Sequence, residues 1–184
     1  MRLSRLLAAV AAVLVAGPAL AAQQDDGPIA TAASPAEAVG ALGLREAVAY
    51  ANPMPRGAPA TDYPLVAWCD ALVTGHADLG ETLTDHAPED VELIRLGRLE
   101  AQDFRSALTA AAPRQSAASK AQADEAAAAA KAQWAPLLAN EDEATRNRAF
   151  GLFFGLPGRC EHAARRIREN ITTPPATPAE VGLE

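Results

Sequence analysis

The sequence lacks the short motifs that identify many enzymes and cofactor-binding proteins. Its 184 residues contain no Gly-x-Ser-x-Gly elbow, phosphate-binding loop, dinucleotide fingerprint, His-Glu-x-x-His motif or Cys-x-x-Cys-His haem-attachment site. No segment carries a clear strand or hairpin signal, and no internal repeat is evident. These absences leave helices as the expected structure and give no motif-based reason to assign an enzymatic activity.

Cysteine and methionine are scarce, with two of each in the chain. Met54 lies in a proline-rich segment, which disfavours a methionine-ligated haem inside a helix bundle. Cys69 and His76 would be about 10.5 Å apart along a helix, too far to share one zinc ion. Cys160 and His162 would point to different sides of their helix. We therefore expect neither a cofactor nor a metal.

The amino-terminal segment has the layout of a secretory signal peptide. Arg2 and Arg5 precede an apolar run over residues 6–16, and a small-residue pattern follows and ends at Ala21. The apolar run is too short to span a membrane comfortably, so we expect no membrane span after cleavage. We expect residues 1–21 to be removed and the protein to be periplasmic or secreted. An uncleaved amino-terminal anchor is the alternative.

Both cysteines lie outside the expected signal peptide. An even number of cysteines in an oxidising compartment indicates a disulfide, here between Cys69 and Cys160. Closing so long a loop removes denatured-state entropy worth roughly 4 to 5 kcal/mol on the chain-entropy model. The alternative is two separate buried thiols.

The charge balance is acidic, with a formal net charge of −7. This balance disfavours nucleic acid or an anionic membrane as the main partner. One basic group near the carboxyl end could bind an acidic partner, but glutamates interrupt it, so a solvated helix face is expected there. Its members are Arg159, Arg165, Arg166 and Arg168.

Proline and glycine divide the rest of the chain into amphipathic segments. Residues 22–33 are expected to be a flexible lead-in, and the proline-rich residues 172–184 are expected to be disordered or extended. We predict an all-α fold over residues 34–171, a single antiparallel bundle of five or six helices whose disulfide joins the second helix to the last. A helical-repeat array is the alternative. The expected helices cover residues 34–51, 62–85, 88–112, 115–135, 140–154 and 158–170.

Local signals refine the first two of these helices. Ser34 is expected to cap the first helix and Asp62 the second, because their side chains can accept hydrogen bonds from unpaired backbone amides. Leu44 and Val48 share one face of the first helix and are expected to be buried. The second helix carries the clearest apolar stripe of the chain and is expected to organise the core.

The segment over residues 115–135 is rich in alanine. Alanine has the highest helix propensity but buries little area. We expect a helix that lies on the surface of the bundle or lets a neighbour approach closely. Trp134 is its expected anchor, and Pro136 is expected to kink or restart it.

The apolar run from Ala149 to Leu156 is the best candidate for a binding patch. The alternative is a central helix that is buried on all sides. The residues of this predicted patch are Phe150, Leu152, Phe153, Phe154 and Leu156.

A weaker candidate site combines His76 and His86 with Asp78 and Asp85, because a carboxylate can orient a histidine as a base. The alternative is a helix-end surface at which histidine favours the negative pole. We predict an exported, non-enzymatic helical protein that binds a protein partner or a small apolar ligand in a bacterial-type periplasm or envelope. An exported enzyme, such as a hydrolase using these histidines, and a periplasmic stress chaperone are the alternatives.

Overall fold

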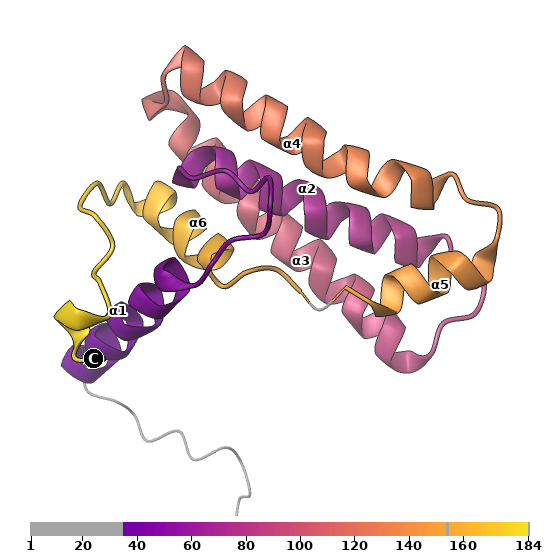
Figure 1. The fold of residues 1–184 in the computed structure, drawn as a ribbon, viewed down its shortest axis with the longest axis horizontal. Coiled ribbons are helices and arrows are strands. Elements are labelled where there is room, and N and C mark those ends of the chain that lie inside the picture. The colour runs from indigo at the N-terminus through magenta and orange to yellow at the C-terminus, as the bar shows by residue number, and fades with distance from the viewer. Residues whose placement is uncertain (1–34, 154, 184) are drawn as a thin grey trace, which may run out of the picture. The chain divides into compact units, whose positions relative to one another are not determined.

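The computed structural model describes residues 35–153 and 155–183, with the backbone alone for residues 35–39 (Figure 1). The expected signal peptide, the lead-in, the cap at Ser34 and Phe154 of the predicted patch lie outside this part. The described part is all-helical, which confirms the predicted class, and no helix in it is long and apolar enough to cross a membrane. Its elements are α1 (Pro35–Ala51), α2 (Asp62–Glu81), α3 (Pro88–Ala111), η1 (Ala112–Arg114), α4 (Ala117–Leu138), α5 (Glu143–Gly151), α6 (Arg159–Glu169) and η2 (Ala179–Val181).

Helix α2 organises the core. It contacts α3, α4, α5 and α6, and Figure 1 shows it running beside α3 and α4. Leu65, Val66 and Leu79 are fully buried, as the apolar stripe of this segment requires. The helix ends at Glu81, four residues before the expected end, because the Thr82 hydroxyl donates to the Leu79 carbonyl and closes the last turn.

A close approach of α2 and α4 uses the small residues of both helices. Ala123 and Ala130 are buried on α4, and Gly75 of α2 lies directly under the indole ring of Trp134. The prediction that Trp134 anchors this helix is confirmed. The helix does not restart at Pro136, because this proline lies inside α4 and the backbone ladder continues from the Ala139 amide to the Ala135 carbonyl.

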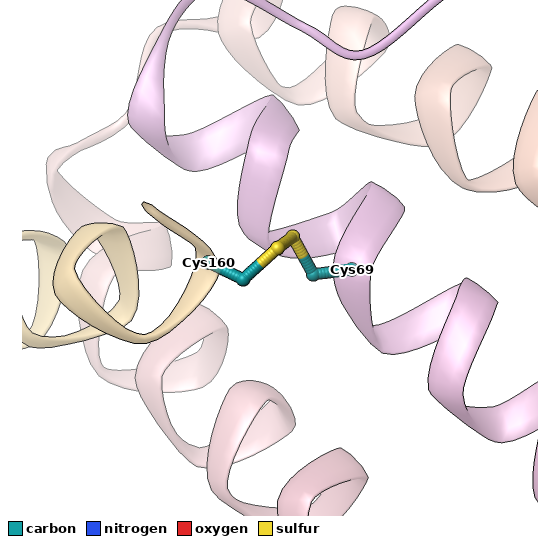
Figure 2. The surroundings of a disulfide bond; sticks show 2 residues. All are labelled: Cys69 and Cys160. Atoms are coloured by element: carbon teal, nitrogen blue, oxygen red, sulfur yellow. A yellow bond between two sulfur atoms is a disulfide. The ribbon is translucent and has the colours of Figure 1, made fainter. Parts of the chain in front are cut away.

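The disulfide joins α2 to the first turn of α6 (Figure 2). Cys69 and Cys160 are both buried, their Cα atoms are 6.1 Å apart, and 91 positions separate them in the sequence. The predicted pairing of the second helix with the last is therefore confirmed.

Helix α1 contacts α6 and η2, and its buried side carries small apolar residues, Ala47 and Ala49, together with a charged one. Leu44 and Val48 are 37% and 41% exposed, so the predicted buried face is wrong. The buried side carries Glu46, whose carboxylate accepts hydrogen bonds from Arg165 and Arg166 of α6. This ion pair turns α1 so that the two apolar side chains face outward.

The arginine group is not the solvated face that the sequence suggests. Arg166 is only 5% exposed and contacts Glu46 and Asp62, while Arg168 pairs with Asp103. Asp62 is consequently not a helix cap; its carboxylate accepts from the Tyr50 hydroxyl and from Arg166. The expected roles of these charged groups differ from the observed ones because their partners come from distant helices.

The carboxyl-terminal residues return to α1. Arg166 donates a hydrogen bond to the Thr173 carbonyl, and η2 contacts α1. The sequence favours a disordered or extended stretch here, whereas the described residues 172–183 include this short helix.

Candidate functional site

The described residues of the predicted patch do not all lie in one helix. Helix α5 is capped by Asp142 and ends at Gly151, so the later part of the apolar run is an irregular connection to α6. Phe150 is buried, Leu152 is 60% exposed, and Phe153 and Leu156 are half-buried. The alternative interpretation of this run, a central helix buried on all sides, is wrong, because α5 ends before most of the run.

His76 lies inside an aromatic stack. Its ring centroid is 4.4 Å from that of Phe150 and 4.4 Å from that of Phe153, and Trp134 meets the ring of Phe153 edge-on at 5.7 Å. The His76 Nε2 atom is 3.0 Å from the Phe150 carbonyl oxygen, which can only accept, so Nε2 carries the proton. Burial lowers the pKa of His76, against a smaller opposing effect of this hydrogen bond.

This environment differs from both interpretations of the histidine cluster. His76 is only 5% exposed and bonds to backbone, so the helix-end surface is wrong for this residue. Asp78 pairs with Arg98 at 2.6 Å, and exposed His86 bonds instead to the Gly80 carbonyl. Among the described residues, no carboxylate orients either histidine at hydrogen-bond distance. The geometry therefore does not support a histidine–carboxylate base.

The tryptophan pocket is an apolar hollow of about 330 Å³ between α2, α4 and the connection from α5 to α6. Helix α2 contributes Trp68 and Leu72, helix α4 contributes Trp134 and Leu137, and the connection contributes Phe153. The remaining lining residues are Pro55, Gln133, Gly155, Leu156 and Pro157. Two residues of the predicted patch, Phe153 and Leu156, thus do line a pocket.

Packing alone orients the two indole rings of this pocket. The Nε1 atoms of Trp68 and Trp134 are buried and have no hydrogen-bond partner in the described part of the chain. A buried, unpaired N–H group lowers the stability of the fold by roughly 1 to 3 kcal/mol. The apolar contacts around both rings therefore have to offset this loss. The rings consequently present apolar faces, with no polar bond that fixes their orientation.

The Glu100 pocket is a second hollow, of about 300 Å³, between α2, α3 and the same connection. Phe153 and Gly155 line both pockets, so this short stretch forms a wall common to the two. The other lining residues are Val73, His76, Leu93, Leu96, Gly97 and Glu100.

Sequence reasoning alone does not identify Trp68, Gln133 or Glu100 as site residues. The tryptophan pocket is built from four segments of the chain and the Glu100 pocket from three, so no local spacing relates their members. The one available signal is the apolar, non-periodic stretch after Gly151, which indicates a segment that packs without being a helix.

Comparisons with known proteins give no match: no family model, curated protein or solved structure is similar to this chain. Among the described residues, no group of three or more histidine, cysteine or acidic side chains is placed to hold a metal ion. A function therefore has to be inferred from the geometry of the pockets.

Proposed function

We propose that this is an exported, non-enzymatic helical protein that binds a small apolar ligand in the tryptophan pocket, in a bacterial-type periplasm or envelope. The observation that carries the proposal is the pocket of about 330 Å³, lined almost wholly by apolar side chains with an indole from each of two helices. Sites for small molecules are typically concave, apolar and of roughly this size or larger.

The surroundings of the pocket also favour a ligand over a catalytic role. His76 is engaged by the Phe150 carbonyl and stacked between two phenyl rings, which leaves it without a carboxylate to act with. Gln133 is the single polar side chain of the lining, so the pocket offers little beyond apolar contact. We propose further that the helices form one antiparallel bundle, in which the connection after α5 covers the pocket from one side.

A titration with the neutral fluorescent probe N-phenyl-1-naphthylamine tests the binding function. Leu137 lines the pocket and Leu138, the next residue of α4, does not. We expect Leu137→Asn to weaken binding of the probe about tenfold or more, because it places an amide in an apolar site. The matched variant Leu138→Asn, with the same change in helix propensity, should bind like the parent protein.

Both variants should first be shown to unfold cooperatively with near-parental helix content. Absence of probe binding by the parent protein, or equal affinity of the two variants, would overturn the proposed site. The remaining form of the hypothesis is then a protein partner, and Leu152 is the most exposed side chain among the described residues of the predicted patch.

Sequencing the amino terminus of the protein from a periplasmic fraction tests export. We expect the mature chain to begin at Ala22, because the small residues ending at Ala21 form the expected cleavage site. Recovery of the full chain from the cytoplasm only, with free thiols at Cys69 and Cys160, would contradict this part of the proposal.

A further inference from the structure

We propose that one face of α3 is a docking surface for a basic amphipathic helix of a partner protein. This α3 leucine face consists of Leu93, Leu96 and Leu99, which follow one another at intervals of three residues and are 49%, 47% and 49% exposed. None of these leucines lines the tryptophan pocket, so the proposal does not rest on the function proposed for that pocket.

The three leucines leave apolar area in water on a helix that already has a separate buried side. Residues three apart lie on one face of an α-helix, so the leucines form a stripe rather than scattered exposed residues. Ala101 and Phe104 of the same helix are buried and provide its contact with the core. A stripe of exposed leucines is typical of an interaction surface, whereas single exposed leucines need no explanation.

The Glu100 pocket adjoins this stripe and offers a place for an anchoring side chain. Leu93 and Leu96 line it together with Val73, Gly97 and Phe153, and its volume is about 300 Å³. A hollow of this size accepts one large apolar side chain, and such anchors supply much of the affinity of protein interfaces. The α3 leucine face therefore combines exposed leucines with an adjoining hollow, as surfaces that bind an amphipathic helix do.

Acidic residues on the same face decide the chemistry of the partner. Four exposed carboxylates follow the helical spacing of the leucines, and they are Glu89, Glu92, Glu100 and Asp103. Ion pairs compensate two of them, Glu92 through Arg95 and Asp103 through Arg168. Glu89 and Glu100 form no ion pair in the described part of the chain, and no lysine or arginine lines the Glu100 pocket. Basic side chains beside the apolar stripe of a partner helix would meet this uncompensated negative charge.

The same charges disfavour two other occupants of the surface. In a two-fold contact between copies of this chain, the same patch lies on both sides, so carboxylates would face carboxylates. Like charges placed opposite one another weaken an interface. An anionic lipid surface would be repelled by these carboxylates and by the net charge of −7. A helix with an apolar stripe and flanking lysine or arginine complements both the leucines and the charge.

Fluorescence anisotropy of a labelled synthetic peptide with the full mature protein tests the proposal. The probe is an amphipathic helix of leucine and lysine, about 15 residues long to match α3 from Glu89 to Asp103, and its counterpart carries glutamate in place of lysine. We expect the basic peptide to bind at least about tenfold more tightly than the acidic one, because only the former meets opposite charge. Equal affinity for the two peptides, or no binding of the basic peptide at about 100 μM, would overturn the proposal.

Paired variants locate the binding surface. Leu96→Asn should weaken binding of the basic peptide about tenfold, whereas Leu44→Asn, the same change at a partly exposed leucine of α1, should not. Glu100→Gln should weaken it about threefold, whereas Glu125→Gln, the same change in net charge at an exposed position of α4, should not. Loss of affinity in both members of a pair, or in neither, would show that the α3 leucine face is not the site.

Three further measurements distinguish the other occupants and the other pocket. Binding of the parent protein, but not of Leu96→Asn, to phosphatidylglycerol vesicles would make the face a membrane surface and overturn the proposal. A dimer that Leu96→Asn dissociates would assign the face to a second copy and overturn it as well. Leu137→Asn should bind the basic peptide like the parent protein, whereas a loss of binding in this variant would place the peptide in the tryptophan pocket.

Discussion

At the scale of single residues, the missing side chain of Gly75 is as important as the large one of Trp134. A Cβ atom at position 75 would overlap the five-membered ring of the indole, and the helices could then not keep their present distance. Trp134 in turn supports both the aromatic stack of His76 and the wall of the tryptophan pocket. The pocket therefore depends on a glycine that does not line it.

We expect Gly75→Ala to lower the free energy of unfolding by about 1 to 3 kcal/mol, because it overpacks the contact of α2 with α4. Gly97→Ala is the matched control. A Cβ atom at that position of α3 would lie 3.5 Å from the Val73 side chain, an ordinary van der Waals distance, and alanine has a higher helix propensity than glycine. Urea unfolding of both variants measures the difference. Equal stability of the two variants would show that the close approach is not constrained by Gly75.

His76 should make the stability of the protein depend on pH. Burial lowers its pKa from the ordinary value of 6.5, and burial has the same effect on His162. Below pH 6.5 the unfolded chain therefore binds protons that the folded chain does not, so the free energy of unfolding falls as the pH falls. The slope contributed by each histidine is at most about 1.4 kcal/mol per pH unit.

Comparing urea unfolding at pH 7.5 and pH 5.5 for the parent protein and for His76→Leu checks this expectation. The variant should lose less stability between the two pH values than the parent does, and His162 should account for part of what remains. If the free energy of unfolding changed equally between the two pH values in both proteins, His76 would be excluded as a source of the pH dependence.

At the scale of elements, a buried ion pair decides how α1 attaches to α6. Glu46 and Arg166 are each 5% exposed and their side chains are 2.5 Å apart, with Asp62 of α2 as a second partner of the guanidinium. Burying two charges is costly, so such a pair adds little net stability, but removing one partner leaves the other charge uncompensated. The pair therefore fixes the orientation of α1 and contributes little to the stability of its contact with α6.

We expect Arg166→Met to destabilise the protein by about 2 to 4 kcal/mol, because Glu46 is left buried with Arg165 as its remaining arginine partner. The double variant Glu46→Gln with Arg166→Met should recover part of this loss, and urea unfolding measures both values. Arg95→Met, which breaks an exposed pair with Glu92, should change stability by less than about 0.5 kcal/mol. If the changes in the free energy of unfolding from the two substitutions were strictly additive, Glu46 and Arg166 would not be coupled.

At the scale of the whole molecule, the disulfide is the one covalent tie between segments that are far apart in the chain. It fixes α6 to α2 and so fixes one end of the connection that forms the common wall of the two pockets. Reduction should lower the free energy of unfolding by roughly 4 kcal/mol on the chain-entropy model, a large share of the stability of a domain of this size.

Urea unfolding with and without a reducing agent tests this expectation. The double variant Cys69→Ala with Cys160→Ala should have the stability of the reduced protein and should not respond to the reductant. A loss below about 1 kcal/mol on reduction would show that the cross-link does not restrict the unfolded chain as the model assumes.

Several features of the fold can be predicted from local sequence. The period of the apolar residues and the placement of proline locate the helices to within a few residues, since both act on the backbone over short distances. With two cysteines only one intramolecular pair exists, so the composition fixes the two partners of the disulfide. Trp134 is recognisable as an anchor because its alanine-rich segment contains no other large apolar side chain.

The sequence by itself thus determined the all-helical class, the approximate helices and the covalent link, whereas only the tertiary structure decided which side chains face one another. His76 meets Phe150 across 74 positions, and Glu46 meets Arg166 across 120. Helical periodicity identifies a face of each helix but not the neighbour that covers it, so the outward turn of α1, the buried arginine and both pockets depended on long-range packing. The physical reason is that burial and pairing are set by distance in space, which local spacing along the chain does not specify.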